Sequence, residues 1–189
     1  MVGLDQPAAA AATAGAPRGS RVLVAYASRY GSTRGVGERI ASRLREHGSP
    51  VELLEVEAVE DLSAFDGVVF GSPVFNQRWL PAVEEFARCN RAALAERPVW
   101  LFSVGTFGDR KRLIGPLMKR EPKGIGALQN AIRPREYRVF AGVIDRHQWP
   151  FLSRLFFYAL GGRLGDNRDW PAIDAWAEEI AQALAQRAT

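Results

Sequence analysis

Serine and threonine hydroxyls and a glycine follow the first strongly apolar run of the sequence. The run ends at residue 27, and Ser28-Arg29-Tyr30-Gly31-Ser32-Thr33 leads from it into a helical pattern. Hydroxyls and backbone amides at the start of a helix suit a phosphate monoester, which they hold without a metal ion or a lysine. The alternative is a turn whose hydroxyls only cap the helix. We call residues 28–33 the phosphate loop and treat them as a candidate anion site.

Two other nucleotide-binding loops do not fit the same stretch. A P-loop requires a lysine after its second glycine, and no lysine follows the glycines here. A dinucleotide fingerprint requires a third glycine, whereas Gly35-Val36-Gly37 is followed at that place by Ile40. Hydrolysis of a nucleoside triphosphate and binding of a dinucleotide are therefore not predicted.

The elements around the phosphate loop alternate between apolar strands and amphipathic helices. The sequence predicts strands over residues 21–27, 51–56, 66–74, 98–105 and 137–145, and helices over 33–48, 80–94 and 169–186. This alternation predicts an α/β fold, with an open five-stranded parallel sheet, right-handed crossovers and helices on both faces. Ligands of such sheets bind beyond the carboxyl ends of the strands, which is where the phosphate loop lies.

The chain is expected to form a single domain over residues 21–189, after a disordered Ala-rich extension over residues 1–20. Residues 106–136 are less regular and rich in Gly, Pro and basic side chains, and an insertion is expected at about 146–168. Residues 151–160 of the insertion are strongly apolar. A peripheral membrane contact, packing on the sheet and a homodimer interface all remain open for them.

Composition narrows the classes of function. The formal net charge is +4, but the basic residues are spread along the chain without a nucleic-acid motif, so no nucleic-acid partner is predicted. One cysteine and two histidines are too few for a zinc site, so no metal is predicted. The single Cys89 excludes an internal disulfide, agrees with a cytoplasmic location and is expected to be a small buried residue. No apolar run approaches the roughly 20 residues that span a bilayer.

The stretch "VAYASRYGSTRGVGERIA", residues 24–41, resembles the phosphate loop of the flavodoxin-like flavoproteins. This resemblance implies FMN as the cofactor, with its phosphate held by residues 28–33. It also implies that the segments after the third and fourth predicted strands flank the flavin ring, where small residues allow a close approach and aromatic side chains lie against a ring. The ring-site candidates are Ser72, Pro73, Val74, Phe75, Asn76, Trp79, Val104, Gly105, Thr106, Phe107 and Gly108. For Phe75 and Trp79, ordinary packing against the next helix is the alternative.

The C-terminal third, residues 140–184, looks like the corresponding region of the menaquinone-dependent protoporphyrinogen IX dehydrogenase family. The residues that carry this likeness are Gly142, Trp149, Phe156, Phe157, Gly161, Gly162, Asp166, Trp170 and Trp176. The resemblance implies an FMN-dependent oxidoreductase of haem biosynthesis that oxidises a protoporphyrinogen-like molecule and reduces a quinone. The sequence departs from the family at residues 145–149, which are less basic, and in the loop after the fourth strand.

Alternative functions remain open at the level of the sequence. A flavodoxin-type electron carrier, an FMN-dependent quinone reductase and a flavin-free binding module would all keep the same fold. The basic charge argues against the carrier, because most carrier flavodoxins are strongly acidic. Candidate partners for substrate carboxylates are Arg78, Arg110, Lys111, Arg112, Arg146 and Arg154, with solvated surface arginines as the alternative. No catalytic residue is assigned.

Overall fold

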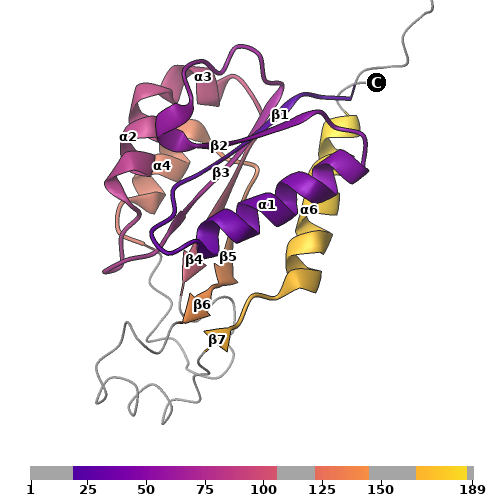
Figure 1. Ribbon diagram of the computed structural model, residues 1–189. Coiled ribbons are helices and arrows are strands. Elements are labelled where there is room, and N and C mark those ends of the chain that lie inside the picture. The colour runs from indigo at the N-terminus through magenta and orange to yellow at the C-terminus, as the bar shows by residue number, and fades with distance from the viewer. Residues whose placement is uncertain (1–18, 106–121, 145–164, 187–189) are drawn as a thin grey trace, which may run out of the picture.

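A parallel sheet lies at the centre of the computed structural model, which describes residues 19–105, 122–144 and 165–186 (Figure 1). Its strands are β1 (Val22–Tyr26), β2 (Val51–Glu55), β3 (Gly67–Pro73), β4 (Val99–Gly105) and β5 (Glu136–Ala141). They pair in the order β2-β1-β3-β4-β5, and every pairing is parallel. The predicted open five-stranded parallel sheet is therefore confirmed.

Helices cover both faces of this sheet, as predicted. Helices α1 (Ser32–Glu46) and α6 (Trp170–Ala185) lie side by side on one face, and α2 (Pro81–Cys89), α3 (Arg91–Ala95) and α4 (Ile125–Ile132) lie on the other (Figure 1). A short 3-10 helix, η1 (Val56–Ala58), follows β2. Each face has its own apolar core, because the strands are buried on both sides. Within the described residues, no helix is long and apolar enough to cross a membrane.

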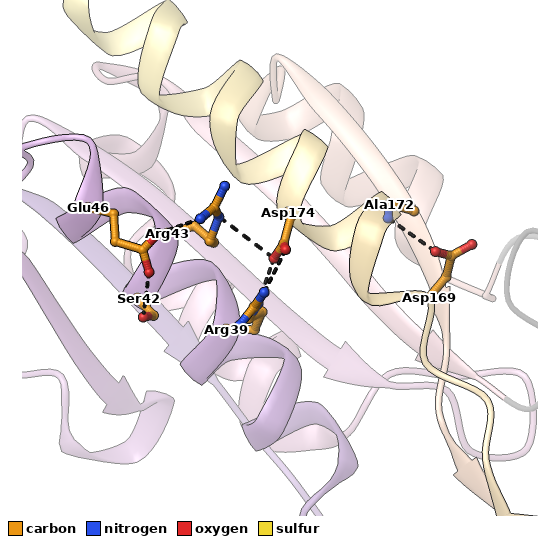
Figure 2. A network of polar contacts seen from close by, with 7 residues as sticks. All are labelled: Arg39, Ser42, Arg43, Glu46, Asp169, Ala172 and Asp174. Carbon is orange, nitrogen blue, oxygen red and sulfur yellow. Dashed lines mark hydrogen bonds and ion pairs between the residues drawn. The ribbon is translucent and has the colours of Figure 1, made fainter.

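Ion pairs join α1 to α6, on the outer side of the apolar core that these two helices form with the sheet (Figure 2). Arg39 of α1 donates two hydrogen bonds of 2.6 Å to the carboxylate of Asp174 in α6. Arg43, one turn further along α1, places its Nε 3.8 Å from the same carboxylate. The hydrogen bonds from Arg39 hold the pKa of Asp174 below its usual value. At the start of α6, Asp169 accepts a hydrogen bond from the Ala172 amide, as expected for a helix cap.

Two of the predicted elements are each divided into two in the structure. The helix predicted over 80–94 divides at Asn90, whose backbone N–H and side-chain amide both donate to the Phe86 carbonyl oxygen. The strand predicted over 137–145 ends at Ala141, and Val143–Ile144 forms β6, which pairs antiparallel with β7 (Gly165–Asp166). Residues 125–132, which lie in a stretch predicted to be irregular, form α4.

The prediction that Cys89 is buried is wrong, because its side chain is exposed at the end of α2. Its thiol donates a hydrogen bond to Glu85 one turn earlier, at 3.2 Å. Hydrogen bonding to the Glu85 carboxylate raises the pKa of the Cys89 thiol above its ordinary value, because ionisation would remove the proton that the thiol donates.

Cys89 is therefore expected to react slowly in spite of its exposure. Alkylation by iodoacetamide, followed by mass spectrometry across a pH series, should show a midpoint above that of an unperturbed thiol. Glu85→Ala removes the carboxylate, so the midpoint should fall toward the ordinary thiol value. An unchanged midpoint in Glu85→Ala would contradict the assigned cause.

Candidate cofactor site

The strand order reverses between β1 and β3, and the candidate residues gather at that reversal. From β1 the chain passes to β2 on one side, then returns to β3 on the other side. A crevice forms beyond the carboxyl ends of the strands at such a switch point, and ligands of open α/β sheets bind there. The phosphate loop follows β1, and residues 74–79 follow β3, so both predicted segments lie at this edge.

Gly31 gives the phosphate loop its shape. It precedes α1 with a φ of 82°, a left-handed conformation that glycine adopts without strain. Its backbone N–H donates to Ser28 Oγ at 3.0 Å, which closes the loop. Among the described residues no side chain caps the start of α1, and no acidic residue lies in its first turn. The positive end of the helix is therefore open to an anion.

Thr33 provides the test of whether a phosphate fits this loop. Its side chain is 1% exposed, and its Oγ1 has no hydrogen-bond partner in the part of the chain that the structure describes. Buried hydroxyls are nearly always hydrogen-bonded, because an unpaired one costs free energy. A phosphate oxygen at the start of α1 would supply the missing partner. The residues present thus fit a phosphate-bearing cofactor.

Ser32 joins the phosphate loop to the end of β5. Its Oγ accepts a hydrogen bond of 3.0 Å from the Val143 backbone N–H, so the hydroxyl hydrogen remains available to donate to an anion. Gly142 makes this approach feasible, since a Cβ there would lie 2.8 Å from Ser32 Oγ and 2.9 Å from Val104 Cγ1. Sequence reasoning had not placed Gly142 and Val143 in this site, because it continued the strand through them.

The ribbon of β6 and β7 brings a second side chain to α1. Arg168, just after β7, donates bidentate hydrogen bonds of 2.9 and 2.6 Å to Asp166, and its guanidinium lies 4.4 Å from the Trp170 ring centroid. A Cβ at Gly35 would collide with this guanidinium. The absence of a side chain at Gly35 thus leaves room for the Arg168 guanidinium beside α1.

A tight turn follows β3 at the other side of the crevice. Phe75 and Arg78 exchange backbone hydrogen bonds of 2.9 and 3.0 Å, while Asn76 and Gln77 between them have φ values of 49° and 60°. Positive φ at both central positions defines a type I′ turn. Asn tolerates this conformation better than Gln. The backbone carbonyl oxygen of Gln77 accepts a hydrogen bond of 2.7 Å from the Lys123 backbone N–H.

Replacing Gln77 with glycine is expected to raise the free energy of unfolding by about 1 kcal/mol, because glycine relieves the left-handed strain. Thermal and urea unfolding of the two proteins would measure the difference. Leu128→Gly in α4 is a control that should destabilise. A destabilised Gln77→Gly protein would mean that the Gln77 side chain makes a larger contribution than the strain costs.

Two ring-site candidates have side chains that are engaged in the core. Trp79 is 4% exposed, and its indole N–H donates to Ser103 Oγ at 2.6 Å, which also lies 2.8 Å from the Tyr137 hydroxyl oxygen. Ser72 is fully buried, accepts from the Leu80 N–H and donates to the Pro73 carbonyl oxygen. This burial favours packing for Trp79 and a turn-organising role for Ser72.

The remaining candidates divide between the edge of the sheet and segments that are not described. Pro73, Val74, Val104 and Gly105 lie at or just after the ends of β3 and β4, while Phe75 and Tyr30 are exposed beyond the carboxyl ends of β3 and β1. The guanidinium of Arg29 lies over the rings of Phe75 and Tyr30. Outside the described residues are Thr106, Phe107 and Gly108, the carboxylate-binding candidates at 110–112, 146 and 154, and the apolar residues 151–160.

Comparisons with known proteins agree with this geometry. The model of the flavodoxin domain matches residues 23–165. Protoporphyrinogen IX dehydrogenase (quinone) of Escherichia coli K12 is 24% identical over 172 residues, which cover 85% of this chain and 94% of that protein. The match therefore extends over nearly the full length of the relative.

Solved structures of low sequence identity share the fold. A flavodoxin from the domain Archaea has a TM-score of 0.59 and 14% identity, covering 87% of this chain and 99% of its own. The rubredoxin:oxygen oxidoreductase of Desulfovibrio gigas has a TM-score of 0.61 and 16% identity over 88% of this chain, which spans only 36% of that protein. Because the flavodoxin-domain model covers most of the sequence, the chain belongs to the flavodoxin-domain family of FMN-binding oxidoreductases.

Proposed function

We propose that this protein is an FMN-dependent dehydrogenase that oxidises protoporphyrinogen IX, or a similar apolar molecule, and transfers the electrons to a quinone. The observation that carries the proposal is the match to the E. coli dehydrogenase, which covers 94% of that protein. The likeness of residues 140–184 to the same family supports the proposal. This region includes Gly142, which lies beside Ser32 of the phosphate loop.

The charge near the crevice supports a small-molecule substrate over a basic protein partner. Neither residues 27–32, after β1, nor residues 74–80, after β3, include an aspartate or glutamate. A carrier flavodoxin that docks on basic redox partners would need acidic groups near its flavin, because complementary charge steers such encounters. The exposed side chains here are aromatic, basic or neutral amides and none is acidic, which suits an apolar substrate with anionic substituents.

The residues of this chain would bind and orient the cofactor. The α1 amides and the Ser32 and Thr33 hydroxyls of the phosphate loop would hold the phosphate, with Ser32 held in place by the Val143 N–H. Phe75 and the ends of β3 and β4 would border the ring. When bound, FMN supplies the redox chemistry by accepting a hydride or single electrons.

The proposal is tested with purified protein loaded with FMN. Anaerobic incubation with protoporphyrinogen IX and menadione should yield fluorescent protoporphyrin and the quinol, at a rate that depends on enzyme and on both reactants. Heat-treated protein controls for spontaneous oxidation. Protein that binds FMN but leaves protoporphyrinogen unchanged with menadione would contradict the proposal.

The same preparation separates the alternative functions. An FMN-dependent quinone reductase would consume NADH or NADPH with menadione and ignore protoporphyrinogen. A flavodoxin-type carrier would exchange electrons rapidly with a ferredoxin-type reductase and show no turnover of either small molecule. Protein that binds no FMN would leave only the flavin-free binding module.

A further inference from the structure

The exposed apolar side chains of this protein gather at the edge of the sheet that bears the cofactor site. Among the described residues, the exposed large hydrophobic side chains are Tyr30, Phe75 and Val143, at 61%, 45% and 43% exposure. They follow β1, β3 and β5 respectively, on three separate segments. Apolar groups from three separate segments at one edge indicate contact with a ligand more than chance exposure.

Arg29 connects two of these aromatic side chains. Its guanidinium carbon lies 4.5 Å from the ring centroid of Phe75 and 5.4 Å from that of Tyr30, so it links the phosphate loop to the turn after β3. Stacking on aromatic rings fixes a guanidinium in place while its N–H groups can still donate in the plane. The side chain is thus positioned before any ligand arrives.

Arg29 also has no anionic partner among the described residues. In the part of the chain that the structure describes, its guanidinium forms neither a hydrogen bond nor an ion pair. Two other exposed arginines near acidic residues are paired: Arg34 with Glu38, and Arg88 with Glu85. A preorganised arginine without a carboxylate is suited to receive one from a ligand.

Two further cations extend this positive surface along the turn. Arg78, at its end, pairs through a parallel bridge with Lys123, and both side chains are exposed. Within the described residues, Glu84, whose Oε1 approaches Gly124, forms an ion pair with neither of them. The turn after β3 thus presents an aromatic ring between cationic groups.

We propose that Arg29, held by Phe75 and Tyr30, binds a carboxylate of the substrate, and that the substrate is an apolar ring molecule with a carboxylate at its edge. The aromatic rings contact the apolar body, and the guanidinium pairs with the carboxylate. This inference rests on the proposed function, because it names how the same site selects its substrate. It assigns Arg29 a role that differs from holding the FMN phosphate.

Equilibrium binding to the FMN-loaded protein tests the assignment. The probes are mesoporphyrin IX, a flat dicarboxylate, and its dimethyl ester, which has the same ring without the charges, both in the same detergent. Wild-type protein should bind the dicarboxylate more tightly than the ester. Arg29→Gln should raise the dissociation constant of the dicarboxylate about tenfold and leave the constants of the ester and of FMN unchanged. Arg34→Gln, the matched control, should change none of them.

The outcomes distinguish this site from the proposed function. The carboxylate assignment would be overturned if Arg29→Gln lost affinity for the dicarboxylate and the ester equally, or lost affinity for neither. Weaker FMN binding in Arg29→Gln would place Arg29 in the cofactor site instead. If protoporphyrinogen is not oxidised but the Arg29-dependent preference for the dicarboxylate persists, the proposed reaction fails and the anion site stands. If oxidation proceeds with the same KM in Arg29→Gln, the site fails and the reaction stands.

Discussion

Replacing Thr33 with valine is expected to stabilise the FMN-free protein and to weaken FMN binding. The Thr33 Oγ1 is buried without a hydrogen bond in the described part of the chain. An unpaired buried hydroxyl costs roughly 1–3 kcal/mol, and valine has the same shape without it, so unfolding should require about 1 kcal/mol more. The lost bond to a charged phosphate, worth about 1.5–3 kcal/mol, should raise the FMN dissociation constant at least tenfold.

Thermal unfolding of the apoprotein and fluorescence titration with FMN measure these two effects. Thr33→Ser keeps the hydroxyl, so it should retain most of the FMN affinity and gain no stability. The opposite signs in Thr33→Val are the informative result, because a residue that only supports packing would lose stability and affinity together. Lower apoprotein stability with unchanged FMN affinity in Thr33→Val would favour a helix-capping loop.

Replacing Gly142 with alanine is expected to disturb the cofactor site from outside the phosphate loop. The added Cβ would lie 2.8 Å from Ser32 Oγ and 2.9 Å from Val104 Cγ1, so at least one of these side chains must move. Overpacking of this kind costs about 1–3 kcal/mol of the free energy of unfolding. A shift of Ser32 should also weaken its hydrogen bond from the Val143 N–H and reduce the affinity for FMN.

Denaturant unfolding and FMN titration of Gly142→Ala test this coupling. Gly126→Ala is the matched control, since a Cβ at that helical position meets nothing within 4 Å and alanine favours a helix. It should stabilise the protein slightly and leave FMN binding unchanged. An unaltered FMN affinity in a destabilised Gly142→Ala protein would show that Ser32 acts independently of β5.

The sheet and the position of the site could be predicted from the sequence because their signals are local. The runs that became β1, β3 and β4 are predominantly apolar, as expected for strands buried on both faces. The hydroxyls and Gly31 directly after β1 marked the loop at the switch point. Asp169 and Pro171 likewise marked the start of α6.

The sequence was least informative where a distant partner decides the local structure. Trp79 could equally border a ligand or pack inward, and its burial depends on Ser103 and Tyr137, which lie far from it in the sequence. The end of β5 depends on Gly142 and on the pairing of Val143 with Asp166. Helix α4 begins after Gly124, which has a φ of 92°, in a stretch where glycines had suggested irregular structure. Cys89 lies in a sequence with a helical pattern, which does not show whether its side chain faces the core. In the structure it lies on the exposed face of α2.

The most direct test of the cofactor assignment is a titration of the apoprotein with FMN and with riboflavin, followed by flavin fluorescence. Riboflavin has the same ring system without the phosphate, so the ratio of the two dissociation constants isolates the contribution of residues 28–33. We expect FMN to bind at least tenfold more tightly than riboflavin, and Thr33→Val to reduce that ratio. Equal affinities for FMN and riboflavin, or no binding of either, would contradict the assignment of this loop as the FMN phosphate site.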